Sequence, residues 1–351
     1  MNAPVQIAAV ATASPERAVG QEEVADFLLA AYGERLRPQS RAVLRKVFAH
    51  PSVRRRRMAA ADLAEVAGED PDRRVERFTR AAVDLSTRAA RKALLAADAA
   101  PDEVESLVVN TCTGYVCPGL SGYVAEALGL RPELRAYDLV GSGCGGAVPN
   151  LELAAGSLNG SGGVALAVSV EICSAAFQMG DDLSLIVSNA LFADGAAAAV
   201  LRRSPGALRI VDSASLHQPE HREAVRFVHR NGQLHNQLAA ELPELTGAAA
   251  AELVPRLLHR HGLSSADISH WVVHPGGERV LAAVGRALGL SDAQLADSRA
   301  VLAEYGNLSS ATVWFILRRV LDAGLAPGER VLMLAFGAGM SAHACLLEAG
   351  S

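Results

Sequence analysis

The chain has 351 residues, of which 50% are hydrophobic and 20% charged, a composition typical of a globular protein of about two domains or one large duplicated one. Its 33 Lys and Arg residues against 38 Asp and Glu residues give a net charge of -5, which argues against a nucleic-acid or anionic-membrane partner. The five cysteines form no CxxC pair, so neither a disulfide framework nor a metal site is expected. Without a signal-peptide pattern or a long apolar run, we expect a cytoplasmic protein.

Residues 41–59 hold the clearest local cluster of positive charge in this acidic chain. Arginine and lysine side chains at such a cluster suit phosphate groups. The run from Arg54 to Arg57 has a second interpretation, because a run of arginines is more often a solvated or salt-bridged face.

The second half of the chain repeats the order of the first. Residues 90–114 predict a helix followed by a buried strand that ends at Asn110, and residues 254–277 predict the same pair with a strand that ends at His274. Such alternation indicates an α/β protein with a mostly parallel sheet covered by helices on both faces. We expect two related halves, residues 1–204 and 205–351, with the boundary in the turn around Pro205.

The stretch LVGSGCGGAVPN, residues 139–150, places Cys144 among glycines where a helix should begin. Glycine is found where the backbone turns sharply or where another molecule comes close, and a helix start can lower the pKa of a thiol. Superposing the repeats puts Asn307 at the equivalent helix start and His274 at a strand end. Each residue has an ordinary alternative: a buried cysteine on a bend, a strand-ending histidine or a helix-capping asparagine.

Cysteine, histidine and asparagine at one junction have the parts for thioester chemistry. Cys144 would be the nucleophile, and His274 can hold it as a thiolate. His274 and Asn307 can together donate hydrogen bonds to a carbonyl oxygen, and so stabilise the enolate that forms when a malonyl group loses carbon dioxide. The three residues therefore predict acyl transfer coupled to decarboxylation and condensation.

The motifs GSGCGGA, WVVHPGG, EYGNLSSA and AFGAGMS resemble, in order and spacing, those of the type III polyketide synthases, the chalcone-synthase-like enzymes. The resemblance implies a duplicated thiolase-type αβαβα layered fold and a homodimer. It also implies loading of an acyl-CoA starter on Cys144, extension with malonyl-CoA, and cyclisation to a pyrone or a phenolic or resorcinolic product. No cofactor is implied beyond coenzyme A thioesters as substrates, and a carrier protein is not expected as a partner. Arginine far outnumbers lysine, which fits a GC-rich bacterial gene.

The resemblance also implies a substrate pocket and contacts to coenzyme A. Phe192 matches an aromatic gatekeeper of the acyl tunnel, and Cys117 matches a position that often reaches across the dimer. The implied pocket residues are Cys112, Thr113, Cys117, Cys173, Ala176, Phe192, His235, Ser309 and Gly337, and the implied coenzyme A contacts are Arg45, Lys46, His50, Gly276 and Gly277. Phe192, Cys112 and Cys173 could equally be ordinary core residues.

Two positions depart from the family pattern. His235 replaces a second aromatic gatekeeper, which allows polar contact with the growing chain. Ala338 stands where the family loop usually has proline, and we expect this to loosen a loop that shapes the cyclisation pocket.

Two alternative functions remain open from the sequence. A ketoacyl synthase III would perform a single condensation onto an acyl carrier protein, although HPGG and GNLSSA favour the first interpretation. A non-catalytic thiolase-fold binding protein is disfavoured because Cys144, His274 and Asn307 are all retained. The starter, the number of extensions and the mode of ring closure depend on pocket differences worth roughly 1–3 kcal/mol per methylene, so the sequence does not name the product.

Overall fold

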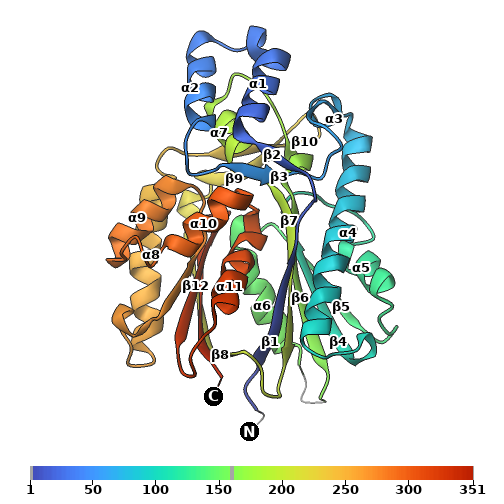
Figure 1. The fold of residues 1–351 in the computed structure, drawn as a ribbon, viewed down its shortest axis with the longest axis vertical. Helices are drawn as coiled ribbons and strands as arrows, with labels where there is room; N and C mark the ends of the chain where they lie inside the picture. Colours follow the sequence, from blue (N-terminus) through green and yellow to red (C-terminus); the bar gives the residue numbers. More distant parts are fainter. Residues whose placement is uncertain (1–2, 159–161, 351) are drawn as a thin grey trace.

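The computed structural model describes residues 3–158 and 162–350. Its centre is a nine-stranded sheet in the order β11-β12-β13-β8-β1-β7-β6-β4-β5 (Figure 1). In that order the strands are β11 (His270–Val273), β12 (Arg330–Gly337), β13 (Ser341–Ala349), β8 (Leu208–His217), β1 (Gln6–Ala13), β7 (Asp194–Arg202), β6 (Val164–Ile172), β4 (Val104–Thr111) and β5 (Arg135–Val140). β6 is buried along its whole length, as its nearly continuous apolar sequence predicts.

Helices form three layers around this sheet, as Figure 1 shows. α6 (Ala147–Gly156) and α11 (Thr312–Ala323) lie in the middle and share one apolar core with strands of both halves. α4 (Pro71–Ala96) and α5 (Leu120–Leu128) cover the outer face of the first half, whereas α8 (Leu242–His259) and α9 (Glu278–Leu288) cover that of the second. The layers therefore alternate in the αβαβα order that the motifs imply.

The expectation of a mostly parallel sheet is wrong. β4 runs parallel to β5 and β6, and β11 runs parallel to β12, but the remaining neighbours are antiparallel. β12 and β13 are joined only by residues 338–340, and a connection this short can join only antiparallel strands. Hydrophobic periodicity identifies a strand but carries no information about its direction.

The duplication is visible in the strand order. β1-β7-β6-β4 in the first half corresponds to β8-β13-β12-β11 in the second. The halves join where β1 pairs with β8 through Gln6 and Ile7, so that two related sheets form one continuous sheet. Residues 203–207 connect β7 to β8, and the boundary expected near Pro205 falls in this connection.

A helical cap that the repeat does not predict covers one end of the sheet (Figure 1). Its elements are α1 (Gln21–Tyr32), α2 (Pro38–Phe48), α3 (Leu63–Gly68), the strand pair β2 (Ala18–Gly20) and β3 (Arg55–Arg57), α7 (Leu183–Leu191), and the hairpin β9 (Val225–Arg230) and β10 (Gln233–Leu238). α10 (Ala296–Tyr305) leads into α11. Within the described residues, no helix is long and apolar enough to cross a membrane.

Candidate active site

Cys144 lies on a single 3-10 turn between β5 and α6. The turn depends on Gly143, whose φ of 57° is unfavourable for other residues and whose Cβ, if present, would lie 2.9 Å from the backbone nitrogen of Ala338. Gly143 therefore allows a sharp turn, as expected, and the close approach there is made by another segment of the same chain.

The loop between β12 and β13 packs directly against this turn. A Cβ at Gly337 would lie 2.2 Å from the carbonyl oxygen of Ser142, so no side chain fits there. The backbone N–H of Ala338 donates to the same oxygen at 3.3 Å, a hydrogen bond that a proline could not make. Ala338 thus ties the loop to the nucleophile turn, contrary to the expectation that it loosens the loop.

His274 follows β11 directly, and its backbone N–H donates to Leu334 of β12 at 2.8 Å. The residue is only 2% exposed, and neither ring nitrogen has a hydrogen-bond partner within the described residues. Burial lowers the pKa of His274 to about 4, so the imidazole is neutral at neutral pH. Buried polar groups are nearly always paired, so an unpaired imidazole indicates a site that a ligand completes.

Asn307 is held by the main chain that follows α7. Its N–H donates to Leu191 at 2.8 Å, and its carbonyl accepts from Ala193 at 2.9 Å. In the side chain, Oδ1 accepts a hydrogen bond from the N–H of Ser309 at 2.8 Å. This contact orients the amide so that Nδ2 is the group left to donate to a ligand.

Segments of the second half pack against the turn that carries Cys144. The backbone N–H of His274 donates to Leu334 of β12. Further along the same strand, Gly337 packs against Gly145, the residue that follows Cys144. The hydroxyl of Ser309, two residues after Asn307, forms a hydrogen bond with Cys144. The nucleophile turn therefore contacts the 3-10 turn that follows Asn307, and it contacts β12, the strand that pairs with β11 just before His274.

The electrostatics differ from the expected thiolate. Burial raises the pKa of Cys144 to about 12, and the hydrogen bond from Ser309 offsets only part of this effect. Within the described residues no hydrogen bond links Cys144 to His274, and both groups are neutral. Burial therefore disfavours an isolated thiolate at Cys144 and an isolated imidazolium at His274.

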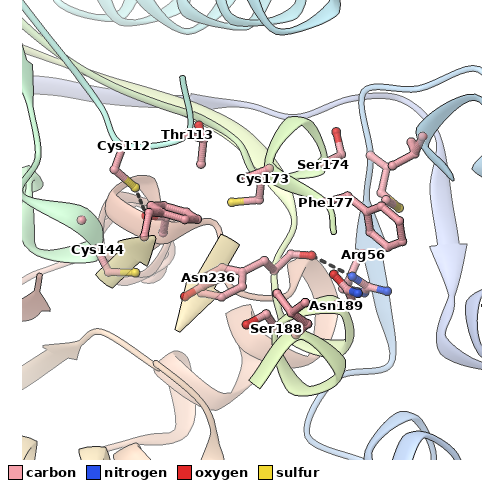
Figure 2. A pocket seen from close by; sticks show the side chains of 18 of the residues that line it. Arg56, Cys112, Thr113, Cys144, Cys173, Ser174, Phe177, Ser188, Asn189 and Asn236 are labelled. Carbon is pink, nitrogen blue, oxygen red and sulfur yellow. Dashed lines mark hydrogen bonds between the residues drawn. The ribbon is translucent and has the colours of Figure 1, made fainter. Parts of the chain in front are cut away.

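A mainly apolar cavity opens beside Cys144 (Figure 2). It encloses about 970 Å³ of empty space, its open mouth included. The predicted pocket residues that line it are Cys112, Thr113, Cys173, Ala176, Phe192 and Ser309. Sequence reasoning missed other residues of its wall, among them Arg56, Phe177, Asn189 and Asn236.

Three predicted pocket residues lie elsewhere. Asn236, rather than His235, lines the cavity, because successive side chains of β10 point to opposite faces. Cys117 is exposed on the surface. Gly337 supports the nucleophile turn and is not among the residues that line the cavity.

Glu171 is a fully buried carboxylate behind the cavity wall, and it was not predicted from the sequence. It accepts hydrogen bonds from the N–H of Cys112 at 3.0 Å, from the hydroxyl of Thr113 at 2.9 Å and from Ser310. Burial raises its pKa. Cys112 in turn contacts Ser309 at 3.2 Å, so one polar network orders the wall next to Cys144. A single carboxylate within the apolar strand 164–172 was the available signal.

The residues expected to contact coenzyme A lie outside the cavity. Arg45 and Lys46 are exposed on the last turn of α2, and His50 follows that helix with its Nδ1 2.8 Å from the hydroxyl of Ser52. Gly276 and Gly277 precede α9, where a Cβ at Gly277 would lie 3.7 Å from the side chain of Leu191.

The arginine run follows the second interpretation. Arg55 pairs with Glu304, and Arg57 donates to the carbonyl oxygen of Glu16 at 2.7 Å. Arg56 is buried against the cavity. Only Arg54 among the four remains exposed without a hydrogen bond or ion pair from its side chain in the described part of the chain.

Comparison with known proteins identifies the family of this chain. Residues 62–210 match the family described as FAE1/Type III polyketide synthase-like protein, and residues 210–349 match the C-terminal domain of chalcone and stilbene synthases. A 3,5-dihydroxyphenylacetyl-CoA synthase of Streptomyces toyocaensis is 30% identical over 98% of this chain and 90% of its own. A 1,3,6,8-tetrahydroxynaphthalene synthase of Streptomyces peucetius subsp. caesius is 31% identical over 97% and 92%. An alpha-pyrone synthesis polyketide synthase-like protein of Mycobacterium tuberculosis is 28% identical over 97% and 90%.

A solved structure confirms the fold. The crystal structure of PKS-I from the brown alga Ectocarpus siliculosus superposes with a TM-score of 0.90 and 28% identity, covering 99% of each chain. These matches confirm the duplicated thiolase-type fold and favour the first interpretation over a ketoacyl synthase III or a non-catalytic binding protein. The chain therefore belongs to the type III polyketide synthases, which are decarboxylating, condensing acyltransferases.

Proposed function

We propose that Cys144 carries the acyl chain and that His274 and Asn307 stabilise the oxyanions of each step. The observation that supports this most directly is the pair of buried donors without a protein acceptor. The ring of His274 has no partner in the described residues, and the side-chain oxygen of Asn307 is occupied, which leaves its amide nitrogen for a ligand. Cys144 lines the adjacent cavity. A thioester carbonyl beside Cys144 supplies the missing acceptor.

Loading is an acyl exchange between two thiols. The Sγ of Cys144 attacks the carbonyl carbon of the acyl-CoA starter as its proton passes to His274. The new C–S bond forms, the bond to the coenzyme A sulfur breaks, and the leaving thiolate takes the proton back from His274. The imidazole starts and ends neutral, which matches a pKa lowered to about 4 by burial.

Extension uses the same two donors. Malonyl-CoA loses carbon dioxide, and the electron pair of the broken C–C bond forms the enolate of acetyl-CoA, whose oxygen accepts hydrogen bonds from His274 and Asn307. The enolate carbon then attacks the acyl group on Cys144, and the cysteine sulfur leaves as the thiolate. The product is a β-ketoacyl-CoA that can reload Cys144 for another cycle. These steps require no cofactor beyond the coenzyme A thioesters.

The product we propose is a pyrone or a phenolic or resorcinolic ring. The names of the relatives, which include dihydroxyphenylacetyl-CoA, tetrahydroxynaphthalene and alpha-pyrone synthases, support this range. The cavity offers mainly apolar walls for the starter, and the small side chain of Ala176 leaves space in one of them.

For coenzyme A we propose contacts with Lys46, Arg45, His50 and the backbone at Gly276 and Gly277. Arg45 and Lys46 are exposed on one helical turn, where their charges are available to a phosphate. Residues 1–204 would then supply the nucleophile and most of the anion contacts, and residues 205–351 the oxyanion donors.

We also propose a homodimer in the cytoplasm. β5 is an edge strand with exposed Tyr137 and Val140, and the nearby Tyr115 is exposed as well. Exposed apolar side chains beside an unpaired strand edge favour cover by a second copy of the chain. Sedimentation equilibrium should give twice the monomer mass, and a monomer at micromolar concentration would contradict the dimer.

All five cysteines are free, which supports a reducing compartment such as the cytoplasm.

Intact-protein mass spectrometry tests the catalytic proposal. Wild type and Cys144→Ala would be incubated with a panel of acyl-CoAs, and malonyl-CoA would then be added for product analysis. We expect an acyl adduct on wild type alone, followed by decarboxylated products with more than one extension. An adduct of equal yield on Cys144→Ala, or no adduct and no consumption of malonyl-CoA, would contradict the proposal.

A further inference from the structure

The guanidinium of Arg56 is a buried cation at the wall of the acyl cavity with part of its hydrogen-bonding capacity unused. Arg56 is 2% exposed and lines the cavity that also contains Cys144. Its Nε donates to the side-chain oxygen of Gln21 at 2.9 Å, and its Nη1 donates to the carbonyl oxygen of Phe192 at 2.8 Å. Its Nη2 is buried and has no hydrogen-bond partner in the part of the chain that the structure describes.

The surroundings hold this side chain in one orientation. The guanidinium carbon lies 5.7 Å from the centre of the Phe48 ring. Its aliphatic part passes Gly306, where a Cβ would come within 2.8 Å of the Arg56 Cγ. With Nε and Nη1 bonded and both sides packed, Nη2 is a donor in a fixed position.

Among the described residues, no carboxylate accepts a hydrogen bond from this donor. Asp194 is the carboxylate whose charge acts most strongly on Arg56. Its oxygens already accept hydrogen bonds from other donors. Its oxygens accept from the N–H of Ala59 at 2.7 Å and from the N–H and hydroxyl of Ser174 at 2.8 and 2.6 Å. Asp194 thus balances the charge of Arg56 through space without accepting a hydrogen bond from it.

An unpaired N–H on a buried cation is costly, and an oxygen atom brought by a ligand removes that cost. Figure 2 shows Arg56 and Cys144 on different sides of the same cavity, with Asn189 and Phe177 near Arg56. A chain attached to Cys144 and extending through the cavity therefore approaches a charged donor in mainly apolar surroundings.

We propose that Arg56 is a specificity-determining residue whose Nη2 binds an oxygen atom of the acyl chain carried on Cys144. This inference rests on the proposed function for the identity of the ligand. The ligand class is an oxygen-bearing acyl chain, in which the oxygen comes from the starter or from a keto group formed during extension. An all-carbon chain of the same length leaves the donor unpaired.

The test compares acyl-CoAs of equal chain length that differ by one keto oxygen, placed at successive positions along the chain. Acylation of Cys144 is followed by intact mass in wild type, and equilibrium binding is measured by calorimetry on Cys144→Ala. We expect at least one keto position to be favoured about 10- to 100-fold over the all-carbon chain, since hydrogen bonds to charged groups are the stronger class. In the Arg56→Met background this preference should vanish, while the all-carbon chains keep their affinity within about threefold.

Arg57→Met is the matched control, because the neighbouring arginine binds the carbonyl oxygen of Glu16 and does not line the cavity. It should retain the preference for the keto chain. Thermal unfolding shows whether each variant folds. If Arg56→Met does not fold, the comparison of keto and all-carbon chains on wild type still tests the proposal.

Two results would overturn the inference. The first is a wild type that discriminates at no keto position. The second is an Arg56→Met protein that keeps the preference, or that weakens keto and all-carbon chains equally, as expected if Arg56 only holds the backbone at Phe192. Failure of the proposed function is distinct: no chain would acylate Cys144, while the calorimetric comparison on Cys144→Ala would still report on Arg56.

Discussion

Asn110 and His274 occupy equivalent strand ends in the two halves but have opposite hydrogen-bonding environments. Asn110 donates from Nδ2 to Ser310 at 2.8 Å, and its Oδ1 accepts from Asn150 at 2.7 Å and from Ser169 at 2.6 Å. His274 is equally buried, yet neither of its ring nitrogens has a partner within the described residues. Duplication supplied two similar positions, of which one became part of the core and the other was left open for a ligand.

The helix starts that follow these strands differ in a complementary way. In the first half, Cys144 sits on a glycine turn and its sulfur faces the cavity. In the second half, Asn307 is 1% exposed and its side-chain oxygen is bound by the N–H of Ser309. In the proposed mechanism, the first half thus presents the group that reacts, and the second half presents the donors that stabilise charge.

The strongest test of this comparison is His274→Ala. Removing a donor from an oxyanion site should lower the rate of malonyl-CoA decarboxylation about 10²- to 10³-fold, measured as release of carbon dioxide. The melting temperature should change little, because the imidazole makes no side-chain hydrogen bond in the described structure. His261→Ala, which removes a surface histidine paired with Asp212, is the control and should keep full activity. A loss below threefold for His274→Ala would place the oxyanion donors elsewhere.

The pH dependence of Cys144 alkylation tests whether the open imidazole and the thiol are both neutral. With the pKa of Cys144 raised to about 12, the reactive thiolate is a small fraction that increases as pH rises towards that value. The alkylation rate of free enzyme, followed by mass mapping of Cys144, should therefore rise about tenfold per pH unit between about pH 6 and 10. A plateau beginning below pH 7 would instead show a preformed thiolate–imidazolium pair.

Asn110→Ala should show the converse of His274→Ala. The substitution removes one hydrogen-bond partner from each of Asn150, Ser169 and Ser310 in the core, so we expect a loss of about 2–4 kcal/mol in the free energy of unfolding. Activity per folded molecule should fall by less than about threefold. Denaturant unfolding and decarboxylation assays on the same sample separate the two effects. A stable protein with a large rate loss would mean that the equivalent positions share the catalytic role.

The smallest expected effect concerns the contribution of the first half to coenzyme A binding. Lys46→Glu should raise KM for malonyl-CoA about 5- to 10-fold and leave kcat unchanged, because it reverses a charge that we propose to contact coenzyme A away from the reacting atoms. Lys92→Glu makes the same change on the exposed surface of α4 and is the matched control. Equal changes in KM for the two substitutions would mean that the effect comes from the net charge of the protein and not from a contact between Lys46 and coenzyme A.

Local patterns were sufficient for much of the site. The glycines around Cys144, the strand that ends at His274 and the helix start at Asn307 are recognisable from neighbouring residues and from their repetition along the chain. The face of a short strand was harder to predict, because the cavity receives Asn236 and a shift of one position in β10 reverses the side-chain direction. The strand directions were also hidden, since an apolar run reads the same in either orientation.

By itself the sequence predicted the duplication and proposed a nucleophile with two partner residues from spacing along one chain, and its family motifs implied the layered fold. Only the tertiary structure decided which buried polar groups are satisfied. Asn110 finds Ser310 across 200 residues, and Arg56 finds Phe192 across 136, whereas His274 finds none in the described residues. Hydrogen-bond satisfaction and desolvation depend on groups that are distant in sequence. Desolvation shifts the pKa values of Cys144 and His274. The absence of a nearby acceptor among the described residues leaves Nη2 of Arg56 available to a ligand.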